Sequence, residues 1–438
     1  MNRRDFAKWV MSTGGLASAQ QAAPIPNRRP NHSMASLDLA RMRNEYRKDL
    51  FEDYLPFHER FVNDKQFGGF LCSVRTTGEL VSDEKRVWFE GRGIWVYSFL
   101  YNHLAREQKY LDTAAASVRL LARSKPQDPQ EFRSKALHRG GSPAGPPDTE
   151  VYSDLFVAEG LAEFARASGD RKYWDEAREI VLKCVRRYDR PDYCPEIGRT
   201  YLGPKARDFS GARVQGVWMV LVRATTQMLA VRPDAELEKI SDRCVDAVLN
   251  HHYNPRFQLI NELINHDGSR PKNEYEQLVY AGHAIETLWM LMDEALRRRD
   301  TSLFDKTAAM FKRHCEVSRD RVYGGLLRNL TNVDQNAWTL DKTLFPHQEA
   351  LIGSLMMIEQ RGDPWAQDFY LDIDRYTRSK FPMRSVPSPL WQVIGNRQVD
   401  PTPGMTRAEN YHHPRFLMLN LLAVERMIAK KDTTVGAR

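Results

Sequence analysis

The sequence predicts an all-α fold, specifically an (α/α)6 barrel in which six helical hairpins close into one ring. Past residue 35, apolar residues recur mostly at the spacing of an α-helix. Connections alternate between turns of a few residues and loops of about twenty residues that are rich in Gly, Pro and Asn. A short turn makes antiparallel neighbours and a long loop leads to the next pair, so this alternation indicates repeated helical hairpins. Loop sequences also recur, such as Phe-Gly-Gly-Phe-Leu at 67–71 and Tyr-Gly-Gly-Leu-Leu at 323–327.

Twelve helices are expected along the chain. Their ranges are 36–61, 86–105, 108–124, 151–168, 171–189, 213–231, 235–252, 275–298, 301–318, 340–361, 364–382 and 410–430. Residues 36–438 contain no linker and no change in composition, so they are predicted to form one barrel domain. An open solenoid of helical pairs is the alternative, but it gives no reason for the polar motifs described below.

Residues 1–35 resemble a twin-arginine export signal followed by a linker. Arg3 and Arg4 precede a short, weakly apolar stretch, and Ala17-Ser18-Ala19 supplies the small residues of a cleavage site. The apolar stretch is too short to span a bilayer, so the mature protein is not expected to sit in a membrane. An exported or periplasmic protein is therefore predicted; a cytoplasmic protein with a frayed N-terminus is the alternative.

Charge and cysteine content argue against several classes of protein. The formal net charge of +7 is spread over 438 residues without a Lys/Arg block, so solvated helix faces are favoured over nucleic-acid binding. The five cysteines are scattered and form no CxxC. They predict buried free thiols, and neither a disulfide framework nor a metal site.

Polar residues cluster near the starts of alternate predicted helices. In a six-hairpin ring alternate helices line the inner wall, so side chains at one end of them would surround a central cavity for a small polar ligand. The candidates are Arg92 and Trp95; Tyr152; His283 and Glu286; Lys342, His347 and Glu349; and His412 and Arg415.

Each candidate also has a purely structural interpretation. His283 and Glu286 share a helix face and could hydrogen-bond within the wall, and Arg92 could stack between tryptophans. A purely structural interpretation is harder to sustain for Glu349, because a buried carboxylate needs a lysine, an arginine or a ligand beside it.

The absence of several catalytic and nucleotide-binding motifs argues against other chemistries. There is no GxSxG, HExxH, P-loop or GxGxxG after a strand. A glycoside hydrolase on this fold would need two opposed carboxylates, and Glu349 with Asp154 or Glu159 keeps that alternative open. A sugar-binding protein without turnover is a further alternative.

Five segments, in order along the chain, resemble motifs of the N-acylglucosamine 2-epimerase family. They are Arg86–Trp95, Tyr152–Ala162, Ala281–Glu286, Phe345–Ala350 and Tyr411–Arg415. The resemblance implies an (α/α)6 barrel that interconverts C2 epimers or isomerises aldoses and ketoses, without a metal or redox cofactor. It also implies that His283 and His412 are the acid/base pair, supported by Arg92 and Glu349. The remaining candidates, Tyr152, Glu286, Lys342, His347, Trp95 and Arg415, are then expected to bind the sugar substrate.

Two histidines suit this chemistry. Epimerisation at C2 removes a proton from one face and returns one to the other, and imidazole has a pKa near neutrality. The intermediate carries negative charge on O1, which Arg92 can stabilise. Glu286, one turn from His283, is expected to hold the tautomer of that ring, and Glu349 to bind hydroxyls or assist ring opening.

The substrate is predicted less sharply than the reaction. The segment Gly216–Val220 lacks the histidine of cellobiose 2-epimerases and aldose–ketose isomerases, which favours N-acetylglucosamine and N-acetylmannosamine as the epimer pair. Leu344 and Phe345 replace the family's paired tryptophans, and Leu390–Ile394 departs from its pattern. A cellobiose 2-epimerase or a mannose isomerase therefore stays open, as does the oligomeric state, with a homodimer as one alternative.

Overall fold

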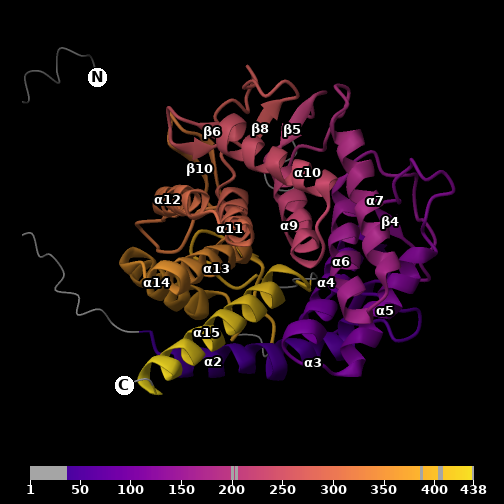
Figure 1. Cartoon of the computed structure of the whole chain (residues 1–438), viewed down its shortest axis with the longest axis horizontal. Coiled ribbons are helices and arrows are strands. Elements are labelled where there is room, and N and C mark those ends of the chain that lie inside the picture. Colours follow the sequence, from indigo (N-terminus) through magenta and orange to yellow (C-terminus); the bar gives the residue numbers. More distant parts are fainter. Residues whose placement is uncertain (1–36, 199–201, 203–205, 385–387, 403–407, 437–438) are drawn as a thin grey trace, which may run out of the picture. The chain divides into compact units, whose positions relative to one another are not determined.

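Six helices form an inner ring in which each contacts the next (Figure 1). In this computed structural model, which describes residues 37–198, 202, 206–384, 388–402 and 408–436, the ring closes where α15 meets α4. The inner helices are α4 (Val87–His103), α6 (Tyr152–Ser168), α9 (Gln215–Val231), α11 (Ala281–Arg298), α13 (Leu344–Arg361) and α15 (His412–Gly436).

A second set of helices surrounds the ring, each packed on one inner helix (Figure 1). These are α5 (Gln108–Ala122), α7 (Arg171–Tyr188), α10 (Ala235–Asp246) with η3 (Ala247–His252), α12 (Thr301–Ser318) and α14 (Pro364–Lys380). The segment paired with α15 runs through α2 (Leu39–Lys48), η1 (Asp49–Tyr54), α3 (Leu55–Phe57) and η2 (His58–Val62). Its wide π-helical turns flank Pro56, which has no amide hydrogen for the helix ladder. The closed set of hairpins confirms the predicted (α/α)6 barrel.

The inner and outer helices differ in how much of their surface is buried. The inner helix α4 is buried at nearly every position from Val87 to Leu100, because neighbours cover it on all sides. The outer helix α7 buries one stripe, which includes Trp174, Ala177 and Val181, and exposes the rest. The short turns carry the expected signals: Gly169 ends α6 with a positive φ of 71°, and the side chain of Asp170 then caps α7.

Short antiparallel ribbons lie in the long loops and were not predicted. The pairs are β1 (Ser73–Val74) with β2 (Leu80–Ser82), β3 (Lys85–Arg86) with β4 (Ala136–Leu137), β5 (Ala212–Val214) with β8 (Leu263–Asn265), β6 (Tyr253–Asn254) with β7 (Leu259–Ile260), β9 (Asn329–Asn332) with β10 (Ala337–Thr339), and β11 (Lys342–Thr343) with β12 (Ile394–Gly395). Strands of two to four residues are too short to show an alternating pattern. Extended backbone also explains why α11 and α13 begin at Ala281 and Leu344, later than predicted.

The two loops with recurring Gly-Gly sequences share one architecture. In the first, Asp64 pairs with buried Lys85 at 3.0 Å and with Arg139 at 2.9 Å. In the second, Asp320 pairs with buried Lys342 at 3.0 Å and with Arg397 at 2.8 Å. Each lysine also donates to a carbonyl of its Gly-Gly turn. These loops begin and end at the mouth of the ring where the inner helices start.

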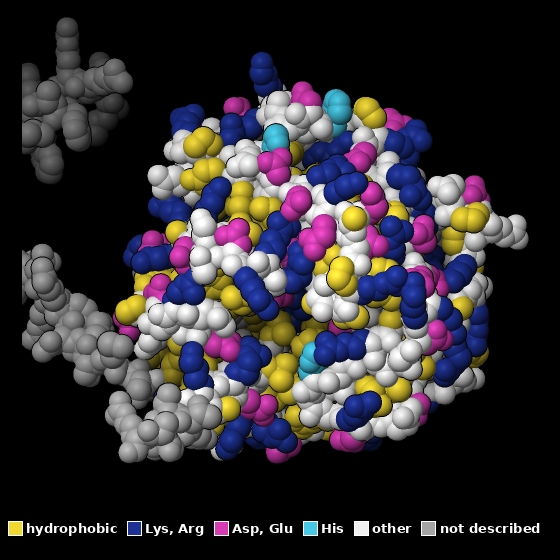
Figure 2. Space-filling view, viewed as in Figure 1, with side chains coloured by type: hydrophobic (Ala, Val, Ile, Leu, Met, Phe, Trp, Pro, Cys, Tyr) yellow, Lys and Arg dark blue, Asp and Glu magenta, His cyan; other side chains and the backbone are white. Residues whose placement is uncertain are grey.

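Several other predictions can be compared with the described residues. Cys184, Cys244 and Cys315 are buried free thiols as predicted, whereas Cys194 is exposed. Lys and Arg side chains alternate with Asp and Glu on the face seen in Figure 2. None of the helices in the described ranges combines the length and apolar character needed to cross a membrane. The predicted export signal at 1–35 lies outside these ranges.

Candidate active site

A cavity of about 760 Å³ opens where the inner helices begin. Every inner helix contributes a side chain or backbone from its first two turns. These residues include Arg92, Tyr152, Gly216, His283, Phe345 and His412. Because a helix carries partial positive charge at its N-terminus, six such ends favour negative charge in the cavity.

His283 lies on α11 and its Nδ1 is 2.9 Å from Oε1 of Glu262. Glu262 is buried in the loop before β8, and its backbone bonds both to Leu278 and to Gln215 at the start of α9, each at 2.8 Å. The carboxylate is therefore held in place. Burial lowers the pKa of His283, but the negative charge and hydrogen bond of Glu262 outweigh it, so the net pKa is raised. The ring is thus biased toward its protonated form.

Glu262, and not the predicted Glu286, is the carboxylate that contacts Nδ1 of His283. No signal in the sequence could identify Glu262, because it lies 21 residues before His283 on a different element. Glu286 instead contacts Arg415 and lies 3.8 Å from Nδ1 of His412. It lines the cavity as well.

Gly216 on α9 lies against the His283 ring. A Cβ atom at this position would come within 3.3 Å of His283 Cε1 and 3.4 Å of Nδ1. The α9 helix therefore carries glycine, with no side chain, where it faces the imidazole.

His412 is the first residue of α15, and its Nδ1 is 2.8 Å from Oε1 of Glu349. Oε1 of Glu409 accepts from the His412 amide at 3.0 Å and so caps the helix. Burial lowers the pKa of His412 to about 3, so the ring is neutral near pH 7. Within the described residues its Nε2 has no hydrogen-bond partner, and the ring lines the cavity.

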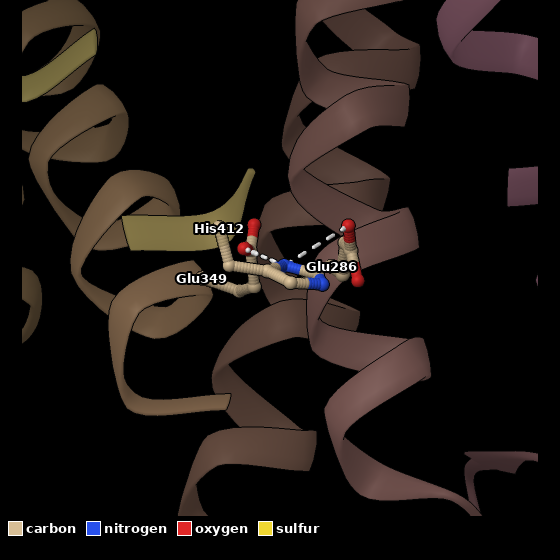
Figure 3. A group of neighbouring side chains, drawn as sticks. All are labelled: Glu286, Glu349 and His412. Atoms are coloured by element: carbon tan, nitrogen blue, oxygen red, sulfur yellow. Dashed lines mark hydrogen bonds and ion pairs between the residues drawn. The ribbon is translucent and has the colours of Figure 1, made fainter. Parts of the chain in front are cut away.

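Glu286, Glu349 and His412 meet in a buried cluster (Figure 3). Their ligand atoms lie within 4.8 Å of one another, close enough to hold a metal ion. Arg415 already supplies a cation there: its Nη2 donates to Glu286 and, at 2.7 Å, to Glu349, and it lies 3.2 Å from His412 Nδ1. A metal ion would have to displace this guanidinium, so the donor set does not fit a resident metal.

Glu349 is fully buried and bonded at both carboxylate oxygens. Trp289 Nε1 donates to Oε2 at 2.8 Å, while Oε1 is shared by His412 and Arg415. The predicted need of Glu349 for a cation is thus met by Arg415. Neither Glu349 nor Arg415 lines the cavity; both contact cavity-lining residues, Glu349 through His412 and Arg415 through Glu286.

Arg92 projects from α4 into a box of aromatic rings. Its guanidinium carbon lies 4.1 Å from the Phe156 ring centre, 4.7 Å from that of Tyr411 and 4.8 Å from that of Trp88. In the described ranges no carboxylate pairs with it, and its Nε has no hydrogen-bond partner. It lines the cavity with its charge uncompensated.

Besides Arg415, three more of the predicted substrate-binding residues lie outside the cavity. Trp95 is buried and stacks on Phe99, with ring centres 4.8 Å apart. Lys342 belongs to the Asp320 ion pair, and His347 Nε2 accepts from the Leu326 amide at 2.9 Å. Lys342 and His347 therefore hold the second Gly-Gly loop. Tyr152 does line the cavity.

The carboxylates of the hydrolase alternative are also outside the cavity. Asp154 is buried between Arg133 at 3.2 Å and Lys183 at 3.1 Å. Glu159 accepts from the Tyr411 hydroxyl at 2.7 Å. Neither faces Glu349 across the space in which a glycosidic bond would lie.

Comparisons with known proteins identify the family and the fold of this chain. Residues 68–414 match the sequence profile described as N-acylglucosamine 2-epimerase. The N-acylglucosamine 2-epimerase of Bos taurus is 28% identical over 335 residues, which cover 73% of this chain and 76% of that protein. The cellobiose 2-epimerase of Bacteroides fragilis is 22% identical, covering 76% of this chain and 86% of that one. The solved cellobiose 2-epimerase of Bacillus thermoamylovorans superposes with a TM-score of 0.74 at 18% identity, covering 88% of this chain and all of that one.

The profile match spans most of the chain, and it includes the cavity-lining residues Arg92, His283 and His412. The first motif begins before α4 and the last one ends within α15, so the match follows the ring almost once around. This chain belongs to the N-acylglucosamine 2-epimerase family.

Proposed function

We propose that this member of the family, a sugar epimerase or isomerase, uses one of His412 and His283 to remove the proton at C2 of an open-chain sugar and the other to deliver a proton to the opposite face of C2. The observation that carries the proposal is the matched support of the two rings. Each lines the same cavity, and each has its Nδ1 bonded to a buried carboxylate. Their helices, α11 and α15, flank α13, whose Phe345 ring centre lies 6.4 Å from His283 and 4.9 Å from His412.

The two environments suggest opposite resting roles. His412 is neutral and can accept the C2 proton, which the adjacent C1 carbonyl acidifies. His283 is biased toward its protonated form and can deliver a proton to the other face of C2. The reverse reaction exchanges the roles. For a sugar with a hydroxyl at C2, protonation of the same intermediate at C1, with the O2 proton passing to O1, would give a ketose, so epimerisation and isomerisation of such sugars share this machinery.

Arg92 is the group suited to the negative charge of the intermediate. Proton removal places that charge on O1, and Arg92 is a cavity-lining cation without a carboxylate partner in the described ranges. The partial positive charges of the six helix N-termini also stabilise negative charge in the cavity.

The favoured substrates are N-acetylglucosamine and N-acetylmannosamine. Two observations support them: α9 carries Gly216 and no histidine beside His283, and the curated relative from Bos taurus is an N-acylglucosamine 2-epimerase. A disaccharide is the second candidate, because a cavity of about 760 Å³ lies toward the upper part of the range of about 300–1,000 Å³ for small-molecule sites.

Proton exchange in deuterated water tests the proposal. N-acetylglucosamine, N-acetylmannosamine, cellobiose and mannose are incubated separately with the enzyme, and NMR follows the C2 proton. Loss of that signal together with appearance of the epimer identifies an epimerase; a ketose identifies an isomerase. Release of reducing sugars from an oligosaccharide without C2 exchange would contradict the proposal.

Residues 1–35 are proposed to be an export signal, on the basis of Arg3, Arg4 and the Ala17-Ser18-Ala19 site. In a bacterial host, changing both arginines to lysine should retain the protein in the cytoplasm, while the original chain reaches the periplasm. Equal distribution of both chains would contradict export by this route.

A further inference from the structure

A second cavity, of about 410 Å³, opens at the opposite mouth of the inner ring. The six inner helices line it with residues from their middle and later turns, and within the described residues it shares no lining residue with the proposed catalytic cavity. Its walls are partly apolar and include Phe99, Trp289, Ile352 and Leu419. Proton transfer at C2 makes no use of this space.

The charges around the second cavity are paired with one another. Arg223 Nη1 lies 2.8 Å from Asp293, Arg426 Nε lies 2.6 Å from Glu359, and Arg297 is held by Glu294 and Glu238. Arg166 is an exposed rim residue beside His103. A charged ligand would have to compete with these ion pairs, whereas a neutral ligand can accept from the guanidiniums and donate to the carboxylates.

Two buried polar atoms in the described lining side chains lack a hydrogen bond, although one of them, Arg223 Nε, lies 3.8 Å from the buried Glu159 carboxylate. Gln227 Oε1 and Arg223 Nε have no hydrogen-bond partner among the described residues. Buried polar atoms are nearly always satisfied, by protein, water or a ligand. Arg223 is itself 5% exposed and lies two turns before the end of α9, so its charge does not merely cap the helix.

We propose that this cavity is a second carbohydrate site, for a neutral polyhydroxylated ligand of monosaccharide size. Hydroxyl groups can serve as donor and acceptor at once, which suits a wall of ion pairs and an unpaired amide oxygen. The ring faces of a sugar are apolar and can pack on the aromatic part of the wall. The volume lies toward the small end of the range of about 300–1,000 Å³ for small-molecule sites.

The position of Trp289 gives the site a regulatory role, and this part rests on the proposed function. Trp289 lines the second cavity, and its Nε1 donates to Glu349, which bonds His412. A ligand that shifts the indole therefore alters the carboxylate that orients a proposed catalytic histidine. Occupancy should change kcat of C2 exchange, since the two sites share this chain of contacts.

Methyl α-D-glucopyranoside is a suitable probe, because its locked anomeric carbon prevents ring opening and C2 exchange. Ala230→Trp tests the site: Ala230 lines the cavity and is exposed, so the larger side chain can cover the mouth without repacking the core. The matched control is Gln108→Trp, an exposed residue at the start of α5. Calorimetry should give at least tenfold weaker binding to Ala230→Trp and unchanged binding to Gln108→Trp. Equal affinity of all three proteins would overturn the proposal.

Crystals soaked in the probe locate it independently of the variants. We expect one sugar ring beside Trp289 and Gln227. Ordered water alone in this cavity, or sugar in the catalytic cavity alone, would overturn the proposal. The probe should also change kcat of the original chain at least twofold and leave that of Ala230→Trp unchanged. If no sugar undergoes C2 exchange, the proposed function fails, while calorimetry and the soaked crystal still decide whether the second site exists.

Discussion

Glu262 holds His283 through a 2.9 Å contact between its Oε1 and the ring Nδ1. The proposed base of the other face, His412, is held by Glu349 at 2.8 Å. The difference between the two pairs lies in their surroundings. Glu349 accepts a hydrogen bond from Trp289 and pairs with Arg415, whose positive charge offsets that of the carboxylate, whereas Oε2 of Glu262 has no hydrogen-bond partner in the described ranges. Glu262 therefore stabilises imidazolium more strongly than Glu349 does.

Replacing Glu262 by glutamine should lower kcat/KM by about 10²-fold, the low end of the contribution of a positioned acid or base. The amide keeps the shape and removes the charge. Because Glu262 raises the pKa of His283, its loss lowers that pKa, and the protonated ring is lost at lower pH. The alkaline limb of the kcat/KM profile should shift toward acid. An unshifted profile with intact folding would show that Glu262 has only a structural role.

Arg92→Met should lower kcat by about 10²- to 10³-fold, as does loss of one oxyanion donor. KM should change much less, because the charge on O1 develops in the transition state. Arg60→Met is the matched control: Arg60 also stacks on an aromatic ring, 4.8 Å from the centre of Phe61, on an exposed helix face. Steady-state kinetics separates the two variants. A large rise in KM with normal kcat would indicate that Arg92 binds the ground state.

Gly216→Ala should reduce activity at least tenfold while the protein stays folded. The new methyl group would come within 3.3 Å of the His283 ring and push it from its position, and small displacements of a catalytic group have large effects on rate. Gly140→Ala is the control, since its Cβ would meet nothing closer than 3.9 Å. Thermal melting and kinetics are measured on both. Normal turnover in Gly216→Ala would show that the space beside His283 is not needed.

Lys342→Met should destabilise the protein and spare the chemistry. Removing one partner of a buried ion pair costs about 3–5 kcal/mol, because the other charge stays buried and unpaired. The pKa of Asp320 is held well below its usual range by Arg397 and Lys342, against the effect of burial, so its contribution is present at neutral pH and is lost in acid. Urea unfolding at pH 7 and pH 3 should show a smaller deficit at pH 3. A raised KM with unchanged stability would place Lys342 in substrate binding after all.

The sequence was sufficient to predict the ring of helical pairs. Gly169 and Asp170 mark the end of one helix and the start of the next, and one-sided apolar stripes such as that of α7 identify outer helices. Strands as short as Lys342–Thr343 show no alternation of apolar and polar residues, so the structure of the long loops could not be predicted.

The cavity was harder to predict than the fold. An inner helix is buried on all sides, so its pattern does not tell which side faces the cavity. On α13 the structure turns Phe345 and Gln348 to the cavity and His347 to the Gly-Gly loop, although all three are buried or nearly so. Glu262 was missed because only tertiary structure brings its loop to α11.

Deuterium incorporation at C2 tests the two-histidine mechanism most directly. The original chain, His283→Asn and His412→Asn are compared, with His413→Asn as a matched control, since His413 is a buried neighbour that bonds Gln348. His283→Asn and His412→Asn should each lose epimerisation. The folded fraction of His413→Asn should exchange the C2 proton as the original chain does. If either His283→Asn or His412→Asn still epimerises a sugar with label at C2 at the original rate, the two-base account is wrong.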